Sequence, residues 1–206
     1  MEEHNLYHFE HHPLLVVISG PAGVGKDSLI QRMMERGYPV HFVITATDRV
    51  PRPGEVHGVD YFFLTTEEFL RMEREGELLE HAIVYGQHKG VPKQQIREAL
   101  ASGQDVIMRV DVQGAATIRR VVPEATMIFL AASSEEEQEK RLRERGGDSS
   151  EQLQQRLAIA REEMKRLPEF DYVVVNRNGE LEQAVDDVAA IIQAEHCCVK
   201  PRVVKL

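Results

Sequence analysis

The chain has 206 residues, of which 42% are apolar and 29% are charged, a composition typical of one globular domain with a substantial core. It carries 25 Lys and Arg residues against 34 Asp and Glu residues, and the formal net charge of −9 argues against a nucleic-acid polymer as partner. The charge does not exclude a small anionic ligand, because a few converging arginines can bind one.

The two ends of the chain show no pattern typical of membrane or secreted proteins. The first apolar run, residues 14–18, is far shorter than the roughly 20 residues of a membrane span. Residues 1–12 lack the cationic start of a signal peptide, and we expect a disordered polar tail there. Cys197 and Cys198 are adjacent, a spacing that suits neither a zinc site nor a disulfide framework. We therefore expect a cytoplasmic protein with reduced thiols and no membrane partner.

Strand and helix signals alternate along the chain. Apolar runs predict strands at residues 14–18, 40–45, 61–64, 78–85, 106–110, 126–130 and 172–175. Amphipathic patterns predict helices at residues 27–36, 65–75, 94–101, 115–121, 134–166 (broken at 146–148) and 180–194. Polar or glycine-rich segments predict loops at residues 48–58 and 86–92. The alternation is typical of a parallel sheet wrapped by helices, and the short strands between residues 40 and 92 suggest an inserted small sheet.

A glycine-rich segment follows the first predicted strand. Residues 20–26 match the first seven positions of the phosphate-binding motif G-x-x-x-x-G-K-[ST], between an apolar strand and an amphipathic helix. Glycines let successive N–H groups point at phosphate oxygens, and the helix N-terminus adds partial positive charge. The candidate residues for binding the phosphates of ATP are Gly20, Ala22, Gly23, Val24, Gly25, Lys26, Asp27 and Ser28.

The eighth position of this motif departs from the pattern. It should be a Ser or Thr whose hydroxyl ligates Mg²⁺, but Asp27 occupies it and Ser28 follows. Either residue could be the metal ligand, since hard cations prefer oxygen. Alternatively, Asp27 pairs with an arginine and the metal is held mostly through water.

Further motifs occur in an order found in one family. Ser19–Lys26 resembles S-G-P-S-G-x-G-K, Thr47–Glu55 resembles T-T-R-x-P-R-x-G-E, and Gly58–Phe63 resembles G-x-D-Y-x-F. Asp111–Gly114 matches D-x-Q-G. Over roughly residues 14–193, the chain therefore resembles the guanylate kinases.

This resemblance implies a three-layer α/β P-loop kinase fold with a parallel core sheet, an inserted small sheet domain that binds the nucleoside monophosphate, and a helical lid. It implies transfer of the γ-phosphoryl group of ATP to GMP or dGMP with Mg²⁺ as cofactor, so the expected partners are small nucleotides. We expect a monomer or a homodimer. The implied parts are an N-terminal tail at 1–12, a core at 13–44 and 93–193, a GMP-binding insert at 45–92, a lid at 140–160 and a C-terminal tail at 194–206.

The resemblance also implies roles for individual residues. Those on the GMP side are Thr45, Arg49, Arg52, Tyr61, Glu80, Lys89 and Asp111. Among them, Arg49, Arg52 and Tyr61 would hold the GMP phosphate. Glu80 would accept hydrogen bonds from the guanine ring N–H and amino group, whereas adenine offers no such donor pair. The implied catalytic residues are Lys26 and the mobile lid arginines Arg141, Arg145 and Arg156.

Five positions depart from the family pattern: Asp27, Asp48, Lys89, Val91 and Arg109. Lys89 replaces a tyrosine and keeps a donor for phosphate. Val91 replaces a hydroxyl residue and removes one hydrogen bond to the base, worth about 1 kcal/mol. Arg109 replaces an acidic residue, so Asp27 and Arg109 together suggest a charge swap. We therefore expect their charged ends to approach closely, as a salt bridge.

Two other functions remain open on these residues. The triplet Lys26-Asp27-Ser28 also resembles the ribose bisphosphate kinases, so the acceptor could be ribose 1,5-bisphosphate. A catalytically weak, guanylate-kinase-like binding module is the second alternative. The altered residues 27 and 109 favour it, and the intact Gly25-Lys26 argues against it.

Overall fold

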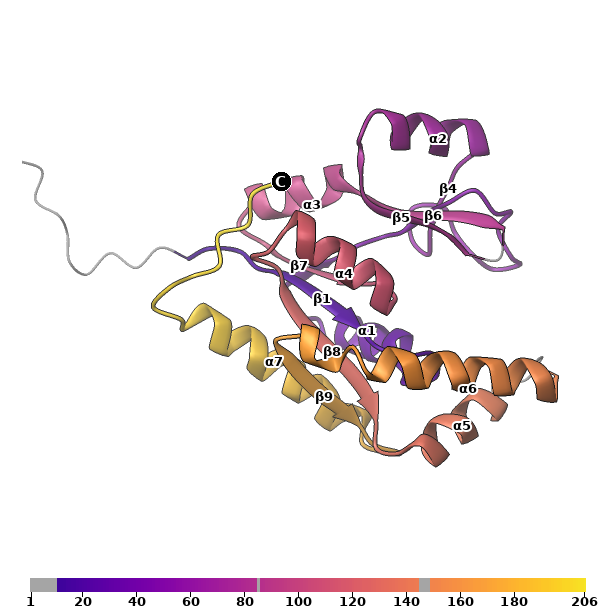
Figure 1. Ribbon diagram of the computed structural model, residues 1–206. Helices are drawn as coiled ribbons and strands as arrows, with labels where there is room; N and C mark the ends of the chain where they lie inside the picture. Colours follow the sequence, from indigo (N-terminus) through magenta and orange to yellow (C-terminus); the bar gives the residue numbers. More distant parts are fainter. Residues whose placement is uncertain (1–10, 85, 145–148) are drawn as a thin grey trace, which may run out of the picture.

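The computed structural model describes residues 11–84, 86–144 and 149–206, which form two sheets and the helices that cover them (Figure 1). The larger sheet is parallel throughout, with strand order β2-β7-β1-β8-β9. Its strands are β1 (Leu15–Ser19), β2 (Val40–Phe42), β7 (Asp105–Arg109), β8 (Thr126–Ala132) and β9 (Tyr172–Asn176). Because β1 is the central strand, the glycine-rich loop leaves from the middle of the sheet's carboxyl edge.

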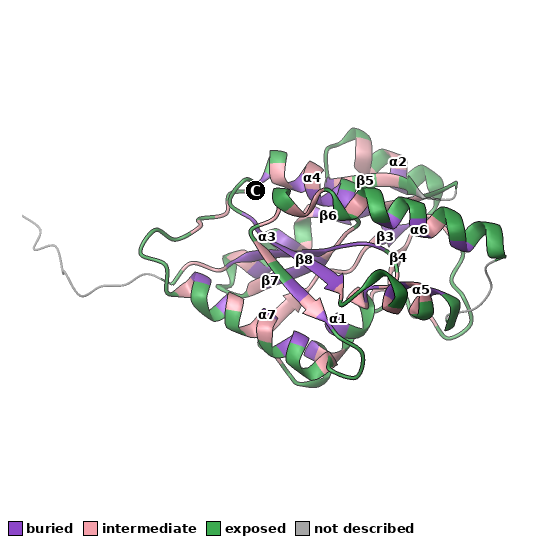
Figure 2. Ribbon diagram, turned by 60° about the horizontal axis from the view of Figure 1, so that its bottom comes forward, coloured by how far each residue is buried: buried purple, intermediate pink, exposed green. Residues whose placement is uncertain are grey.

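Helices cover both faces of this sheet, which explains why β1 is apolar on both sides. Val16 and Ile18 pack in one cluster with residues of two helices, while Leu15 and Val17 pack in another cluster with residues of two others. Figure 2 shows the buried residues gathered on the central strands and on the inward sides of the helices. The helices are α1 (Lys26–Glu35) and α7 (Leu181–His196) on the first face, and α3 (Lys93–Ala101) and α4 (Val112–Val121) on the second. The predicted three-layer α/β fold is confirmed.

The smaller sheet lies beyond the carboxyl edge of the larger one, together with α2 (Thr66–Arg74) (Figure 1). Its strand order is β4-β3-β6-β5, with β3 parallel to β4 and the other pairs antiparallel. Phe69 of α2 is completely buried against Ala46 and Leu78 of the sheet. The strands are β3 (Ala46–Thr47), β4 (Phe62–Phe63), β5 (Leu78–Val84) and β6 (Gln87–Pro92).

The loop predicted at residues 86–92 is wrong, because most of this segment is β6. Its glycines favour a loop in the sequence, but in the structure Gly90 provides space. A Cβ atom at Gly90 would lie 2.9 Å from Cζ of Phe69. The strand predicted at residues 40–45 also differs, since its first half is β2 of the large sheet and the chain then crosses to β3 of the small one.

The chain enters the small sheet once, between β2 and β3, and leaves it once, from β6 directly into α3. Gln95 of α3 ties the two crossings together. Its side-chain Nε2 donates to the carbonyl oxygen of Ile44 at 2.7 Å, and its Oε1 accepts from the N–H of Ile44 at 2.8 Å. Both backbone groups of Ile44 are thus held by one side chain.

The predicted helix over 134–166 is divided into α5 (Glu135–Glu144) and α6 (Ser150–Met164), which pack over Leu142, Leu153 and Leu157. A 3₁₀ turn at Leu167–Glu169 follows. This helix pair lies at the same carboxyl edge as the small sheet, on the other side of β1 (Figure 1). The glycine-rich loop therefore has the small sheet on one flank and the helix pair on the other.

The last helix runs two residues beyond its predicted end, so the segment expected as a C-terminal tail at 194–206 begins inside α7. Val204 and Leu206 then pack against the core. Of the expected N-terminal tail, residues 1–10 lie outside the described residues. Among the helices that the structure describes, none combines the length and the apolar character needed to cross a bilayer.

Two neighbouring valines of β9 test this core directly. Val174 is 2% exposed and Val173 is 52% exposed. Val174→Ala should lower the free energy of unfolding by about 2 kcal/mol, because it removes two buried methyl groups and leaves a cavity. Val173→Ala loses the same atoms at the surface and should cost less than about 0.5 kcal/mol. Urea denaturation measures both values, and equal losses would contradict the assigned burial.

Candidate active site

The loop between β1 and α1 needs glycine at its turning points. Gly20, Gly23 and Gly25 have positive φ angles of 142°, 84° and 97°. Space is limiting as well: a Cβ atom at Gly20 would lie 2.1 Å from the carbonyl oxygen of Leu130, and one at Gly25 would lie 2.5 Å from Nδ2 of Asn176. Conformation and space therefore both demand the motif glycines.

Protein donors hold the carbonyl oxygens of this loop. Gln138 of α5 donates to Ala22 at 2.7 Å, and Asn176 of β9 donates to Val24 at 2.9 Å. The Nζ of Lys26 donates to the carbonyl oxygens of Gly20 and Pro21. In a peptide unit the N–H points opposite to the carbonyl, so the contacts to Ala22 and Val24 turn the N–H groups of Gly23 and Gly25 away from α5 and β9. Such an arrangement of N–H groups is suited to an anion.

Arg141, expected as a mobile lid arginine, is attached to this loop instead. It donates to the carbonyl oxygens of Val24 at 3.2 Å and Asn176 at 2.9 Å, and it forms an ion pair with Glu137. Its side chain is 19% exposed. Arg141 lines a cavity of about 360 Å³ together with Gly25, Ser28 and Asn176. In this structure Arg141 therefore stabilises the loop from behind.

The other two expected lid arginines are Arg156 and Arg145. Arg156 lies on α6 and is half-buried, and it lines neither this cavity nor the one between the loop and the small sheet. Arg145 lies outside the described residues.

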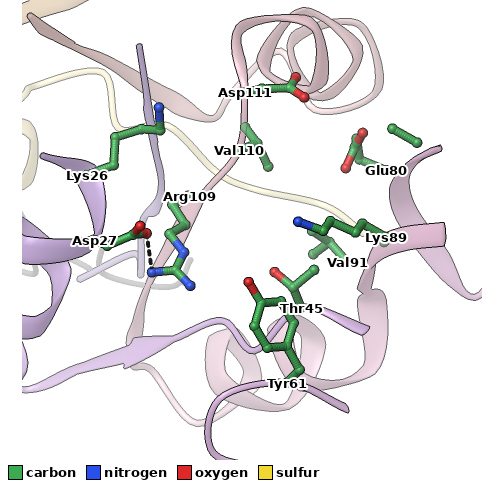
Figure 3. A pocket seen from close by; sticks show the side chains of 12 residues that line it. Lys26, Asp27, Thr45, Tyr61, Glu80, Lys89, Val91, Arg109, Val110 and Asp111 are labelled. Carbon is green, nitrogen blue, oxygen red and sulfur yellow. Dashed lines mark ion pairs between the residues drawn. The ribbon is translucent and has the colours of Figure 1, made fainter. Parts of the chain in front are cut away.

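A cavity of about 310 Å³ lies between the loop and the small sheet (Figure 3). It brings together the start of α1, the carboxyl end of β7, the N-terminus of α4, and residues of the small sheet and the segments beside it. Most of the residues expected on the GMP side line it, although 50 or more positions separate some of them. The lining residues are Lys26, Asp27, Thr45, Tyr61, Glu80, Ala82, Lys89, Gly90, Val91, Arg109, Val110 and Asp111.

Two carboxylates form the acidic end of this cavity. Asp111 caps α4, with Oδ1 accepting from the N–H of Gly114 at 2.7 Å. Glu80 comes from β5, and a Cβ atom at Gly114 would lie 3.2 Å from its Oε1. The glycine of D-x-Q-G thus lets the two acids approach each other. Burial, and then the charge of Asp111, raise the pKa of Glu80 to about 7.

Arg49 and Arg52 do not line the cavity. The guanidinium of Arg49 makes two 2.6 Å hydrogen bonds to Glu55 and lies 4.9 Å from the ring centroid of Tyr61. This pairing, assisted by the N–H of Arg52, lowers the pKa of Glu55 to about 2. Arg49 therefore contacts a lining residue from outside, and Arg52 is exposed.

The expected salt bridge between Asp27 and Arg109 is confirmed. Nη1 of Arg109 lies 2.5 Å from Oδ1 of Asp27, and both residues line the cavity.

Another departure from the family pattern, Asp48, also has a structural explanation. Its carboxylate accepts from the N–H of His88 at 2.8 Å and from Oγ1 of Thr66 at 3.0 Å, and so joins β6 to α2.

Sequence reasoning missed two polar residues near this site. Gln138 is 6% exposed and holds the loop, as described above. Glu163 of α6 is half-buried, and burial raises its pKa although Lys26 attracts its charge. Both lie in the highly charged segment 134–166, whose pattern is typical of a solvated helix face. This segment contains no local signal that distinguishes the two residues from their neighbours.

Comparisons with known proteins agree on one family. A family model described as guanylate kinase matches residues 12–195. The chain is 55% identical over 195 residues to guanylate kinase 2, chloroplastic/mitochondrial, of Oryza sativa subsp. japonica, covering 94% of this chain and 68% of that protein. It is 42% identical over 184 residues to a guanylate kinase of Halalkalibacterium halodurans, with 89% of each covered. The crystal structure of guanylate kinase from Anaplasma phagocytophilum matches with a TM-score of 0.74 at 28% identity, covering 95% of this chain and 91% of that chain.

The raised pKa of Glu80 predicts a pH-dependent loss of stability. Between its ordinary value of 4.5 and about 7, the unfolded chain has released a proton that the folded chain still holds. The folded state therefore loses stability as the pH rises through this window, and the loss is complete above it. Glu80→Gln removes this loss, so its melting temperature relative to the parent protein should rise between about pH 5 and about pH 8.

Glu77→Gln is the matched control, because Glu77 is 44% exposed on the approach to the same strand. Its melting temperature should differ from that of the parent by the same amount at both pH values. A Glu80→Gln difference that is also independent of pH would contradict the raised pKa.

Proposed function

The chain belongs to the guanylate kinase family, and from this premise we propose how its residues bind the two nucleotides and move the phosphoryl group between them. The enzyme transfers the γ-phosphoryl group of ATP to GMP, giving ADP and GDP. The main support for these roles is the cavity, because Lys26 and Asp27 at the end of the phosphate loop lie on one wall and the Glu80–Asp111 pair lies on another.

The acidic end of the cavity suits a guanine base. Guanine carries a ring N–H and an amino group on one edge, and Glu80 can accept both hydrogen bonds when it is ionised. Asp111 lies beside it and contributes further acceptor oxygens. Adenine presents no such donor pair and would leave the oxygens of the half-buried Glu80 carboxylate unpaired, which is costly. The pair therefore favours GMP over AMP.

The middle of the cavity suits the GMP phosphate. Lys89 supplies a cation, and Tyr61 and Thr45 supply hydroxyl groups on the same wall (Figure 3). Arg49 and Arg52 would join them only after the small sheet closes, since neither residue lines the cavity in this structure. We propose this closure as the step that completes the acceptor site.

The loop at residues 20–25 would bind the phosphates of ATP through its N–H groups. Phosphoryl transfer requires little covalent chemistry from the protein, so positioning and charge stabilisation supply the rate. Lys26 would exchange its carbonyl partners for phosphate oxygens. Arg141 after release from Val24 and Asn176, and Arg156 after movement of α6, are the arginines proposed to stabilise the transferred group, with Arg145 beside Arg141 in the chain.

Asp27 and Ser28 fit a role in holding Mg²⁺. Both present oxygen atoms at the start of α1, next to Lys26, and Asp27 is 59% exposed. In the described part of the chain, no group of three or more His, Cys, Asp or Glu side chains could hold a metal. The residues therefore fit an ion bound mainly by phosphate oxygens and water. Once bound, Mg²⁺ would neutralise charge on the phosphates.

An acceptor panel tests the function. With ATP and Mg²⁺, GMP and dGMP should be phosphorylated, and kcat/KM for AMP should be at least about 100-fold lower, because adenine offers no donor pair to Glu80. Lys26→Met should lose at least about 100-fold in kcat with GMP. A coupled assay of ADP formation measures these rates, with ribose 1,5-bisphosphate included as acceptor. Turnover of that sugar alone, or GMP binding without ATP consumption, would contradict the proposed function.

The proposed role of Glu80 also predicts that GMP binding releases a proton. Glu80 is partly protonated near pH 7 and must ionise to accept the guanine hydrogen bonds, so GMP should bind more weakly as the pH falls below 7. Calorimetric titrations in buffers of different ionisation enthalpy measure the protons released. A phosphate group also titrates near pH 6, so Glu80→Gln is the control. An equal release by parent and variant would contradict the assignment.

A further inference from the structure

We propose that Arg109 binds the phosphate of the acceptor nucleotide, and that Asp27 holds its guanidinium in the cavity until the nucleotide arrives. This inference rests on the proposed function, since it places GMP in the cavity between the phosphate loop and the small sheet. It assigns substrate binding to a position where the family pattern has an acid.

The first support is the place of Arg109 in the fold. It is the last residue of β7, which lies next to the central strand β1. In parallel α/β sheets, ligands bind beyond the carboxyl ends of such strands. Figure 3 shows its guanidinium between Lys26 and Asp27 on one side and Thr45, Tyr61 and Lys89 on the other. This is the region between the donor loop and the acceptor wall.

The second support is the distribution of charge along the cavity. With guanine at Glu80 and Asp111, the phosphate of GMP must lie away from these acids, because like charges repel. Among the described residues that line the cavity, the Lys and Arg side chains are Lys26, Lys89 and Arg109. Lys26 belongs to the donor loop, and Arg109 is the arginine of the set. A guanidinium presents a planar fork of donors, which matches a phosphate dianion better than a point charge does.

The third support is that the salt bridge has little structural value. The side chain of Asp27 is 59% exposed and that of Arg109 is 34% exposed. Solvated ion pairs contribute little to folding. The pair instead does two things in the cavity: it restrains the guanidinium, and it neutralises a carboxylate that would otherwise repel incoming phosphates. The second effect alone is the competing explanation, and the experiment must separate the two.

Calorimetric titration with GMP and with guanosine tests the phosphate contact. Arg109→Met should raise the Kd for GMP about ten- to 100-fold, the effect of losing hydrogen bonds to a charged group. It should leave the Kd for guanosine unchanged, because guanosine has no phosphate. Arg109→Lys keeps the charge but not the fork, and should fall between parent and Arg109→Met. Arg120→Met, on the exposed side of α4, is the matched control and should change neither Kd.

The double variant Asp27→Asn/Arg109→Met separates binding from neutralisation. If Arg109 binds the phosphate, the double variant keeps the weakened GMP affinity. If Arg109 only neutralises Asp27, removing both charges restores the parental Kd, and this result overturns the proposal. An unchanged Kd for GMP in Arg109→Met also overturns it. Melting curves of every variant establish that the proteins are folded.

The same titrations distinguish failure of this inference from failure of the proposed function. A parent protein that binds neither GMP nor guanosine contradicts the proposed function itself. A parent protein that binds GMP, combined with an Arg109→Met variant that binds it equally well, contradicts only the role of Arg109.

Discussion

The backbone of the phosphate loop is held from behind, and the rest of the site depends on this contact. Asn176 at the end of β9 and Arg141 on α5 both donate to the carbonyl oxygen of Val24, and Gln138 donates to that of Ala22. The loop cannot relax towards the helices without breaking these bonds. Its N–H groups are therefore oriented before a ligand binds, which is the preorganisation that electrostatic catalysis requires. The same contacts join the helical flank of the site to the sheet.

The distribution of charge also differs between the outer helices and the cavity. The net charge of −9 belongs to the whole chain, and the outer helices α5, α6 and α7 carry many of its acids. Inside the cavity, Glu80 and Asp111 lie at one end, and Lys89 and Arg109 lie in the middle, where Asp27 pairs with Arg109. The net charge of the sequence thus argues against a nucleic-acid polymer as ligand, but it does not bear on the binding of a single nucleotide. Charge placement at the level of single side chains decides the ligand.

Some of this arrangement could be predicted from the sequence, because it depends on neighbours in the chain. The strand, glycine loop and first helix are contiguous, and their pattern predicted them correctly. The salt bridge between Asp27 and Arg109 was predictable since both residues break the family pattern with opposite charges. Residues 86–92 were misinterpreted as a loop, because the ring that needs the space at Gly90 comes from Phe69, far away in the sequence. The pairing of Arg49 with Glu55 and the burial of Gln138 depend on tertiary packing, for which the sequence has no local signal.

The double hydrogen bond from Gln95 to Ile44 has a mechanical consequence. Two separate connections between the sheets could bend independently, and the small sheet could then twist and slide as well as swing. Tied together at one amide, the two connections cannot separate without breaking both hydrogen bonds. Thr45 is adjacent to Ile44 and also lines the cavity. The residue that joins the two sheets is therefore the immediate neighbour of a residue in the cavity wall, so a displacement of the wall at Thr45 acts directly on the hydrogen bonds of Ile44.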